Sequence, residues 1–411
     1  MSPQDPTKYA ARIESDLRRN ILPFWMERVA DRKTGKFLGA LTNDLVPDRA
    51  AERGAILISR ILWTYSAAFG QYREPDHLAM ADLAYADLIE HFADREAGGY
   101  WWSVSADDKV LRDQKRVLGQ AFVIYALAEY HSVTGRAEPL ERAIEVYRLL
   151  EKFALDRRNG GYFEAFDRAW RPISDIRLSE ADPNTPKSQD AHLHLMEAYT
   201  RLLDTWPDAG LRRTLTALME VMLSRIVNPV TGHLGQYFSE DWTLQSDKIS
   251  YGHDIEAAWL MTRAAEVLQD SALAGRIQPL AVKIAEVTLA EGVDSDGGVY
   301  YEAGAGGLTN TNKEWWPQAE AVVGFINAFQ LSGQERFLGA AFRTWDFIER
   351  RLIDHRRGEW FKCVTRDGHV FENEPKVGFW KCPYHNGRTA LEAVRRLRGL
   401  SGNGSRSPAT Q

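Results

Sequence analysis

Cysteine is nearly absent from this chain, which has only Cys363 and Cys382 in 411 residues. So few thiols exclude a disulfide framework and fit a reducing compartment. Long hydrophobic runs are missing as well, because no stretch approaches the roughly 18 uninterrupted apolar residues that a membrane span needs. The first 25 residues are charged and lack the apolar core of a signal peptide. We therefore expect a cytoplasmic protein that is neither exported nor anchored to a membrane.

Charge of one sign is not in large excess. Lys and Arg number 51 and Asp and Glu 57, which gives a net charge of −6 with both signs interspersed. This balance indicates neither a nucleic acid nor an anionic membrane as partner. No glycine-rich phosphate loop precedes a helix, which argues against a nucleotide cofactor. Residues 400–411 are rich in Gly and Ser and predict a disordered tail.

The chain does contain a repeated motif, a glycine followed by aromatic or β-favouring residues. It recurs about every 60 residues, and once after about 75, as GKFLGAL near residue 37, GGYWWSV near 100, GGYFEAF near 162, GQYFSED near 237, GGVYYEA near 299 and GEWFKCV near 360. Each copy predicts a short strand entered through a tight turn. A repeat of this length determines the architecture before local detail does.

Between successive strands there is room for two helices. Apolar periodicity predicts helices at 7–30, 49–70, 75–95, 111–134, 136–155, 186–205, 207–226, 248–268, 272–290, 312–331, 334–352 and 383–399. The even-numbered members are richer in small and apolar residues, as buried inner helices would be. We therefore predict an all-α fold, an (α/α)6 barrel with short β-hairpin elements at one end, built by residues 1–399 as a single domain. The alternative is an open helical array, whose ends would need polar caps.

Unusual polar residues gather on the even-numbered helices. They are Arg60, His194, His253, Glu256, Trp316, Glu320, His385 and Arg388. In a closed barrel the inner helices run parallel, so these positions converge on one end of the central cavity. Such a concentration of titratable groups exceeds what structure alone requires.

Each of these residues also has a purely structural interpretation. His253 and Glu256 share a helix face and would form a buried, satisfied pair. Arg60 would be an interior ion-pair partner of Glu320, and His194 a hydrogen-bonded core residue. His192 should face away from the cavity. Of the adjacent Trp315 and Trp316, only one should face the cavity while the other packs between helices.

The chemistry that such a cavity supports is proton transfer, because histidines titrate near neutral pH and carboxylates orient them. A zinc site needs three or four ligands, and His-x-x-Glu supplies half of one, so we expect no metal. In an open-chain sugar the proton on C2 is acidic, and its removal leaves an enediolate that a cation stabilises. Two bases on opposite faces favour epimerisation, whereas one base serving both carbons favours isomerisation. A glycoside hydrolase and a non-catalytic carbohydrate-binding barrel are the rival interpretations.

Several motifs resemble the N-acylglucosamine 2-epimerase superfamily, and within it the cellobiose 2-epimerase branch. They are SRILW, LHLMEAYT, SYGHDIEAAWL, EWWPQAEAVVGF, GEWF and WKCPYHNGR, and the resemblance runs from about residue 15 to 398. It implies an (α/α)6 barrel that epimerises a small-molecule sugar without cofactor or metal. We expect a monomer or weak homo-oligomer.

The resemblance also implies roles for particular residues. His253 and His385 match the acid/base pair acting at C2, His194 a histidine associated with ring opening, and Arg60 an arginine that contacts sugar oxygens. The remaining matches are the orienting carboxylates Glu256 and Glu320 and the pocket aromatics Trp259, Trp316 and Trp380, the last as a stacking platform for a second glucose.

Two positions depart from the family pattern. Leu118 stands where we expect tyrosine, and Asp190 where we expect asparagine. Both changes alter the hydrogen-bonding wall of the pocket, which affects substrate choice more than reaction type. Two substrates therefore stay open: the reducing-end glucose of cellobiose and related β-1,4 disaccharides, or free mannose and glucose.

Overall fold

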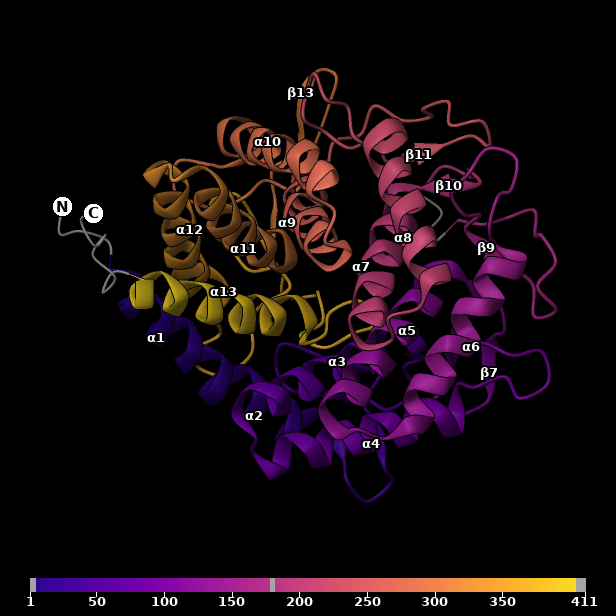
Figure 1. Ribbon diagram of the computed structural model, residues 1–411. Coiled ribbons are helices and arrows are strands. Elements are labelled where there is room, and N and C mark those ends of the chain that lie inside the picture. The colour runs from indigo at the N-terminus through magenta and orange to yellow at the C-terminus, as the bar shows by residue number, and fades with distance from the viewer. Residues whose placement is uncertain (1–4, 178–181, 404–411) are drawn as a thin grey trace, which may run out of the picture.

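Two concentric rings of helices form the computed structural model, which describes residues 5–177 and 182–403 (Figure 1). The inner ring consists of α3 (Ala55–Tyr72), α5 (Val117–Thr134), α7 (Gln189–Thr205), α9 (Tyr251–Leu268), α11 (Trp315–Ser332) and α13 (Tyr384–Asn403). Each inner helix packs against the next, and α13 packs against both α11 and α3. The ring is therefore closed, which confirms the (α/α)6 barrel and rules out the open array.

The outer ring covers the inner one. It consists of α1 (Pro6–Asp16), α4 (Pro75–His91), α6 (Ala137–Phe153), α8 (Ala209–Val221), α10 (Ser271–Val287) and α12 (Glu335–Phe347). Helix α1 lies along α13 and continues through a π-helical turn and α2 (Leu22–Phe24), while α8, α10 and α12 also end in π-helical turns. None of the helices in the described residues has the length and apolarity to cross a membrane.

The sequence assigns each helix to its ring. Helix α5 is buried at every position from Val117 to Ala128, since both of its faces meet other helices. Helix α6 buries only a stripe that includes Ala143, Val146 and Leu150, and its polar residues face solvent.

Short antiparallel strand pairs lie where the chain enters the inner helices. The pairs are β5 (Arg53–Gly54) with β6 (Ser103–Val104), β8 (Lys115–Arg116) with β9 (Ala165–Phe166), β10 (Lys187–Ser188) with β11 (Tyr237–Phe238), and β14 (Lys313–Glu314) with β15 (Cys363–Val364). The other strands are β1 (Ala30–Asp31), β2 (Lys36–Phe37), β3 (Ala40–Leu41), β4 (Pro47–Asp48), β7 (Val110–Arg112), β12 (Glu302–Gly304) and β13 (Gly307–Asn310). Single bridges from Ile249 to Ala303 and from Leu41 to Val377 continue the pattern around the ring.

These strands confirm the predicted hairpin elements and correct two helix boundaries. Helices predicted from residues 49 and 111 begin at Ala55 and Val117, because the residues just before them pair as strands. The predicted tail also needs correction. Leu400 packs against the core and α13 continues to Asn403, while residues 404–411 lie outside the described part of the chain.

The recurring glycines are explained by the contact between each turn and the next inner helix. Gly160 and Gly161 have φ values of 76° and 73°, and a Cβ on Gly161 would lie 2.6 Å from His192 Nε2. That nitrogen accepts a hydrogen bond from the backbone N–H of Tyr162 at 2.8 Å, and Nδ1 donates to the carbonyl of Ser188. Burial lowers the pKa of His192 to about 4. His192 is therefore a neutral structural residue, as predicted.

Buried lysines connect the same turns to the strands through ion pairs. Four pairs share this arrangement: Lys115 with Asp94, Lys187 with Asp156, Lys313 with Asp294 and Lys376 with Asp354. Three of the lysines begin the strand before an inner helix, and Lys376 precedes the bridge residue Val377. Each aspartate caps the turn after an outer helix. These ion pairs fix the ends of the inner helices that carry the polar cavity.

Breaking one such pair should destabilise the protein strongly. Lys187→Ala removes the ammonium that donates to Asp156 at 2.7 Å and to the carbonyls of Gly160 and Glu240. Because it leaves a buried carboxylate unpaired, we expect the free energy of unfolding in urea to fall by about 3–5 kcal/mol. Arg142→Ala is the control, since its pair with Glu138 is exposed and should contribute only about 0.3–0.5 kcal/mol. Equal losses in both variants would contradict this account.

Candidate active site

The closed ring turns the sequence repeat into a single layer of side chains. Arg60, Phe122, His194, Glu256 and Glu320 each stand five residues after the first residue of their inner helix. The sixth inner helix, α13, adds His385 and Arg388 from its first turns.

A cavity of about 330 Å³ opens above this layer. Nine of the eleven predicted site residues line it: Arg60, Leu118, Asp190, His194, His253, Glu256, Trp316, Trp380 and His385. Glu320 and Trp259 are not among the lining residues. Trp259, expected to line or shape the pocket, does not line it: its indole N–H donates to Glu320 Oε2 at 3.0 Å, so it supports this carboxylate from behind the cavity wall.

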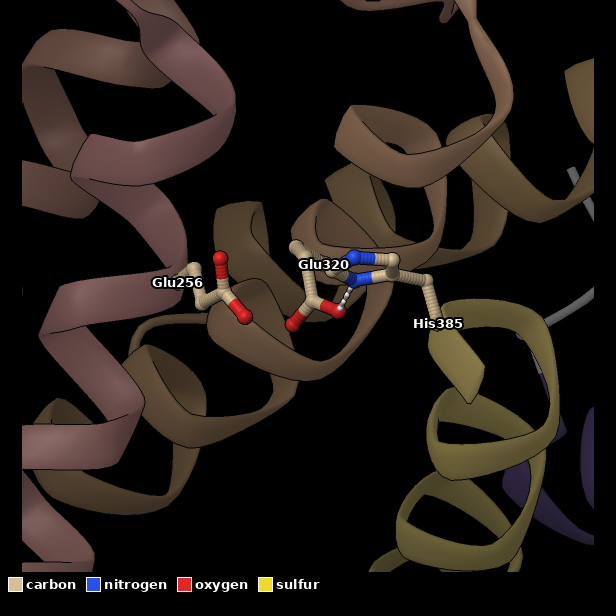
Figure 2. A group of neighbouring side chains, drawn as sticks. All are labelled: Glu256, Glu320 and His385. Atoms are coloured by element: carbon tan, nitrogen blue, oxygen red, sulfur yellow. Dashed lines mark hydrogen bonds and ion pairs between the residues drawn. The ribbon is translucent and has the colours of Figure 1, made fainter. Parts of the chain in front are cut away.

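His385 is held by Glu320 (Figure 2). Its Nδ1 donates to Glu320 Oε1 at 2.7 Å, which leaves the lone pair of Nε2 free. Burial lowers the pKa of His385 well below its ordinary value, and the positive charges of Arg60 and Arg388 lower it further. His385 is therefore a neutral imidazole whose tautomer is fixed by its neighbour.

Arg388 connects carboxylates from three other inner helices. One terminal nitrogen bonds Glu197 and the hydroxyl of Tyr384, and the other bonds Glu256 and, at 2.7 Å, Glu320. The side chain is fully buried. Burial and the charge of Glu320 raise the pKa of Glu256 to about 7, although Arg388 opposes this effect.

The ion-pair partner of Glu320 is thus Arg388, and the predicted pair with Arg60 is not formed. Arg60 instead lies over the rings of Phe122 and Tyr384, 4.2 and 5.0 Å from their centroids. These are cation–π distances. Within the described residues its Nε has no hydrogen-bond partner and Arg60 forms no ion pair, although its charge acts on Asp190.

His194 lies between two carboxylates of its own helix. Its Nδ1 is 3.0 Å from Glu197 Oε2, and its Nε2 is 3.3 Å from Asp190 Oδ1. Burial alone would lower the pKa of His194, but Asp190 and Glu197 outweigh it and raise the pKa to about 9. At neutral pH His194 is an imidazolium.

His253 and Glu256 do not form the satisfied pair that their spacing suggests. His253 Nδ1 and Glu256 Oε2 are buried, and in the described part of the chain neither has a hydrogen-bond partner. The Nε2 of His253 lies 3.7 Å from Asp190 Oδ1, and burial lowers the pKa of this histidine. The pair diverges because Glu256 turns to Arg388. An unsatisfied buried polar group costs about 1–3 kcal/mol of stability. Native proteins keep such groups mainly where they have a function.

Both adjacent tryptophans border the cavity, so the prediction that only one would do so is wrong. The ring of Trp316 lies 4.6 Å from His253 and 5.6 Å from His385. Trp315 meets His385 edge-on at 6.3 Å. Because α11 stands between α9 and α13, Trp316 separates the two histidines.

Glu256, Glu320 and His385 offer ligand atoms within 4.8 Å of one another, as a metal site would (Figure 2). The guanidinium of Arg388 already bonds both carboxylates, and a cation placed there would meet its positive charge. These residues therefore fit an ion-pair network better than a metal.

Glu197 and Tyr384 belong to the site but are missed by the sequence analysis. Glu197 repeats, three residues after His194, the spacing of His253 and Glu256. That repetition is a signal that could have identified it. Tyr384 precedes Arg388 by one helical turn, but only the structure shows that both contact Glu197.

The geometry defines the class of protein: an (α/α)6 barrel with histidines and carboxylates converging on a cavity at the end where its inner helices begin. The chain belongs to the N-acylglucosamine 2-epimerase (GlcNAc 2-epimerase) family, whose model matches residues 36–386.

Known proteins match nearly the whole chain in sequence and in structure. The cellobiose 2-epimerase of Bacteroides fragilis is 42% identical over 385 residues, which cover 93% of this chain and 97% of that protein. A sugar epimerase from a ruminal bacterium superposes with a TM-score of 0.91 at 37% identity, covering 94% of this chain and 99% of the other. The cellobiose 2-epimerase of Spirochaeta thermophila gives a TM-score of 0.90 at 36% identity, covering 98% and 100%.

The charge on His194 should make stability depend on pH. Its folded pKa of about 9 exceeds the ordinary 6.5, so the protonated form stabilises the fold. This contribution is complete below about pH 6.5 and is lost as the pH rises through about 9. We expect the difference in unfolding free energy between wild type and His194→Gln to shrink over that range in urea denaturation. A difference that stays constant or grows would refute the assignment.

Proposed function

We propose that the protein is a cofactor-independent carbohydrate 2-epimerase that converts the reducing-end glucose of cellobiose and related β-1,4 disaccharides to mannose. One observation carries this proposal: two neutral histidines, His253 and His385, border one cavity from either side of Trp316, together with the cations Arg60 and His194. The substrate is supported by relatives named cellobiose 2-epimerases at 34–42% identity.

The proposed reaction begins with removal of the C2 proton from the open-chain sugar by one histidine. His385 suits this step, because Glu320 holds Nδ1–H and the lone pair of Nε2 is free. His385 keeps the abstracted proton as an imidazolium. His253, whose side chain is 23% exposed, takes up a proton from solvent and gives it to C2 from the other face, so it ends neutral. In the reverse direction the two histidines exchange roles. Each general acid or base contributes about 10²–10⁴-fold to rate.

The intermediate is an enediolate, and its negative charge needs preorganised positive groups. Arg60 serves here because it lines the cavity and, among the described residues, forms no ion pair with a carboxylate. Arg388 acts indirectly, because it fixes Glu320, which in turn orients His385.

A second glucose would stack on Trp380, which is 38% exposed and borders the cavity. Trp102 lies 5.9 Å from it and holds the ring in place. An indole face suits the C–H patches of a pyranose. Leu118 makes one part of the wall apolar, where a hydroxyl was expected.

Incubation with cellobiose in D2O, followed by proton NMR, tests the reaction. We expect the mannose-containing epimer with deuterium at C2. His253→Ala and His385→Ala should each slow C2 exchange by at least about a hundredfold. The matched control is the exposed His369→Ala, which should exchange at the wild-type rate. Near-normal exchange of the C2 proton in both site variants would refute the proposal. Release of free glucose would indicate a hydrolase instead.

The choice between disaccharide and monosaccharide rests on Trp380. Trp380→Ala should lower kcat/KM for cellobiose about tenfold, corresponding to roughly 1.4 kcal/mol of lost stacking, while turnover of free mannose changes little. Steady-state kinetics on both sugars measures this. Equal losses on the two sugars, or turnover of mannose alone, would favour the monosaccharide substrate.

A further inference from the structure

Asp190 lies between two histidines from different helices. Its Oδ1 is 3.3 Å from Nε2 of His194, one helical turn further along α7, and 3.7 Å from Nε2 of His253 on α9. The side chain is 28% exposed, and Asp190 is among the residues that line the cavity where a sugar would bind. A carboxylate in this position can therefore contact substrate directly.

The pair of Asp190 and His194 presents a proton acceptor and a proton donor side by side. Glu197 holds Nδ1 of His194, so the proton on Nε2 is the one nearest the cavity. Burial alone would raise the pKa of Asp190. The neighbouring histidines outweigh this effect and lower the pKa to about 2. At neutral pH the pair is a carboxylate next to an imidazolium.

Epimerisation at C2 first requires the pyranose ring to open. The anomeric hydroxyl must lose a proton while the ring oxygen gains one. We propose that Asp190 is a catalytic residue for this step, an inference that rests on the function proposed above. Its carboxylate takes the proton of the anomeric hydroxyl, and Nε2 of His194 gives a proton to the ring oxygen. The C1–O5 bond breaks, C1 becomes the aldehyde carbon, and no proton enters or leaves the site.

The pair then resets itself. As His194 loses its charge, Asp190 loses the cation that keeps it a weak base, so its affinity for the incoming proton rises. Afterwards the proton passes from Asp190 Oδ1 to His194 Nε2 across their 3.3 Å contact. Ring opening and closing therefore need neither His253 nor His385, and the protein should interconvert sugar anomers as a separate activity. An asparagine at this position could donate a hydrogen bond but could not accept the proton.

Other charged and titratable groups surround the pair on every side. They are Glu197 on α7, Arg60 on α3, His253 and Glu256 on α9, Glu320 on α11, Tyr384, His385 and Arg388 on α13, and on the Asp190 side Glu164 and, in β11, Tyr237. Glu197 also pairs with Arg388, and the cationic group nearest Asp190 is His194.

The test is the rate of α–β anomer exchange of cellobiose, measured by two-dimensional exchange NMR with full-length protein. Wild type and His385→Ala should both accelerate it, the latter without placing deuterium at C2. Asp190→Asn should reduce the catalysed exchange by about a hundredfold. The matched control is Asp76→Asn, the same change at an exposed aspartate of the outer helix α4 that does not line the cavity. It should keep the wild-type rate of anomer exchange.

The outcomes separate this inference from the proposed function. Deuterium at C2 without faster anomer exchange, or full anomer exchange in Asp190→Asn, would overturn the role of Asp190 and leave the epimerase intact. Faster anomer exchange in wild type and its loss in Asp190→Asn, without deuterium at C2, would support the pair and reject the epimerase.

A wild-type measurement covers the case in which Asp190→Asn does not fold. Anomer exchange should fall as the pH rises through about 9, where His194 loses its proton. Nitrogen-15 NMR of the histidine rings should show both His194 nitrogens protonated at pH 7. A neutral His194 at that pH would refute the pair.

Discussion

The guanidinium of Arg388 is the interaction on which the site depends. It draws together Glu197, Glu256 and Glu320, which come from three different inner helices. Taking such a group out of water is costly, and removing one partner leaves the other charges buried and uncompensated. Because Glu320 is fixed in this way, the orientation and tautomer of His385 follow, and Trp259 completes the support of the same carboxylate.

Two electrostatic environments exist within one small cavity. His385 lies near Arg60 and Arg388 and is neutral, whereas His194 lies between two carboxylates and is charged. Residues of the same type thereby receive different tasks. A neutral imidazole abstracts a proton from carbon, and a charged one polarises or protonates oxygen. The protein achieves this difference with neighbours that mostly come from its own inner ring.

The sequence was sufficient to predict the barrel and most of the cavity, because both follow from the repeat. Five of the inner helices place their sixth residue in one layer, and the hairpin glycines mark where each helix begins. Pairing across the ring was not predictable, since it depends on side-chain directions at the barrel axis. Arg388 instead of Arg60 meets Glu320, and Glu256 turns from His253 toward the same arginine. Trp259 points behind the wall for the same reason. Strand pairing over residues 53–54 and 115–116 shortened two helices, because hydrogen bonds to distant strands outweighed local helical periodicity.

The bridge between Leu41 and Val377 joins the first repeat to the last, and α1 lies along α13. This closure has a consequence for biosynthesis. His385 and Arg388 stand on the final helix, while Glu197, a partner of Arg388, lies 191 residues from it along the chain. Contacts of such long sequence separation form late in folding, because the loop entropy must be overcome first. A nascent chain therefore carries three carboxylates without their cation until the last helix emerges from the ribosome, and the ring closes in the same event that completes the site.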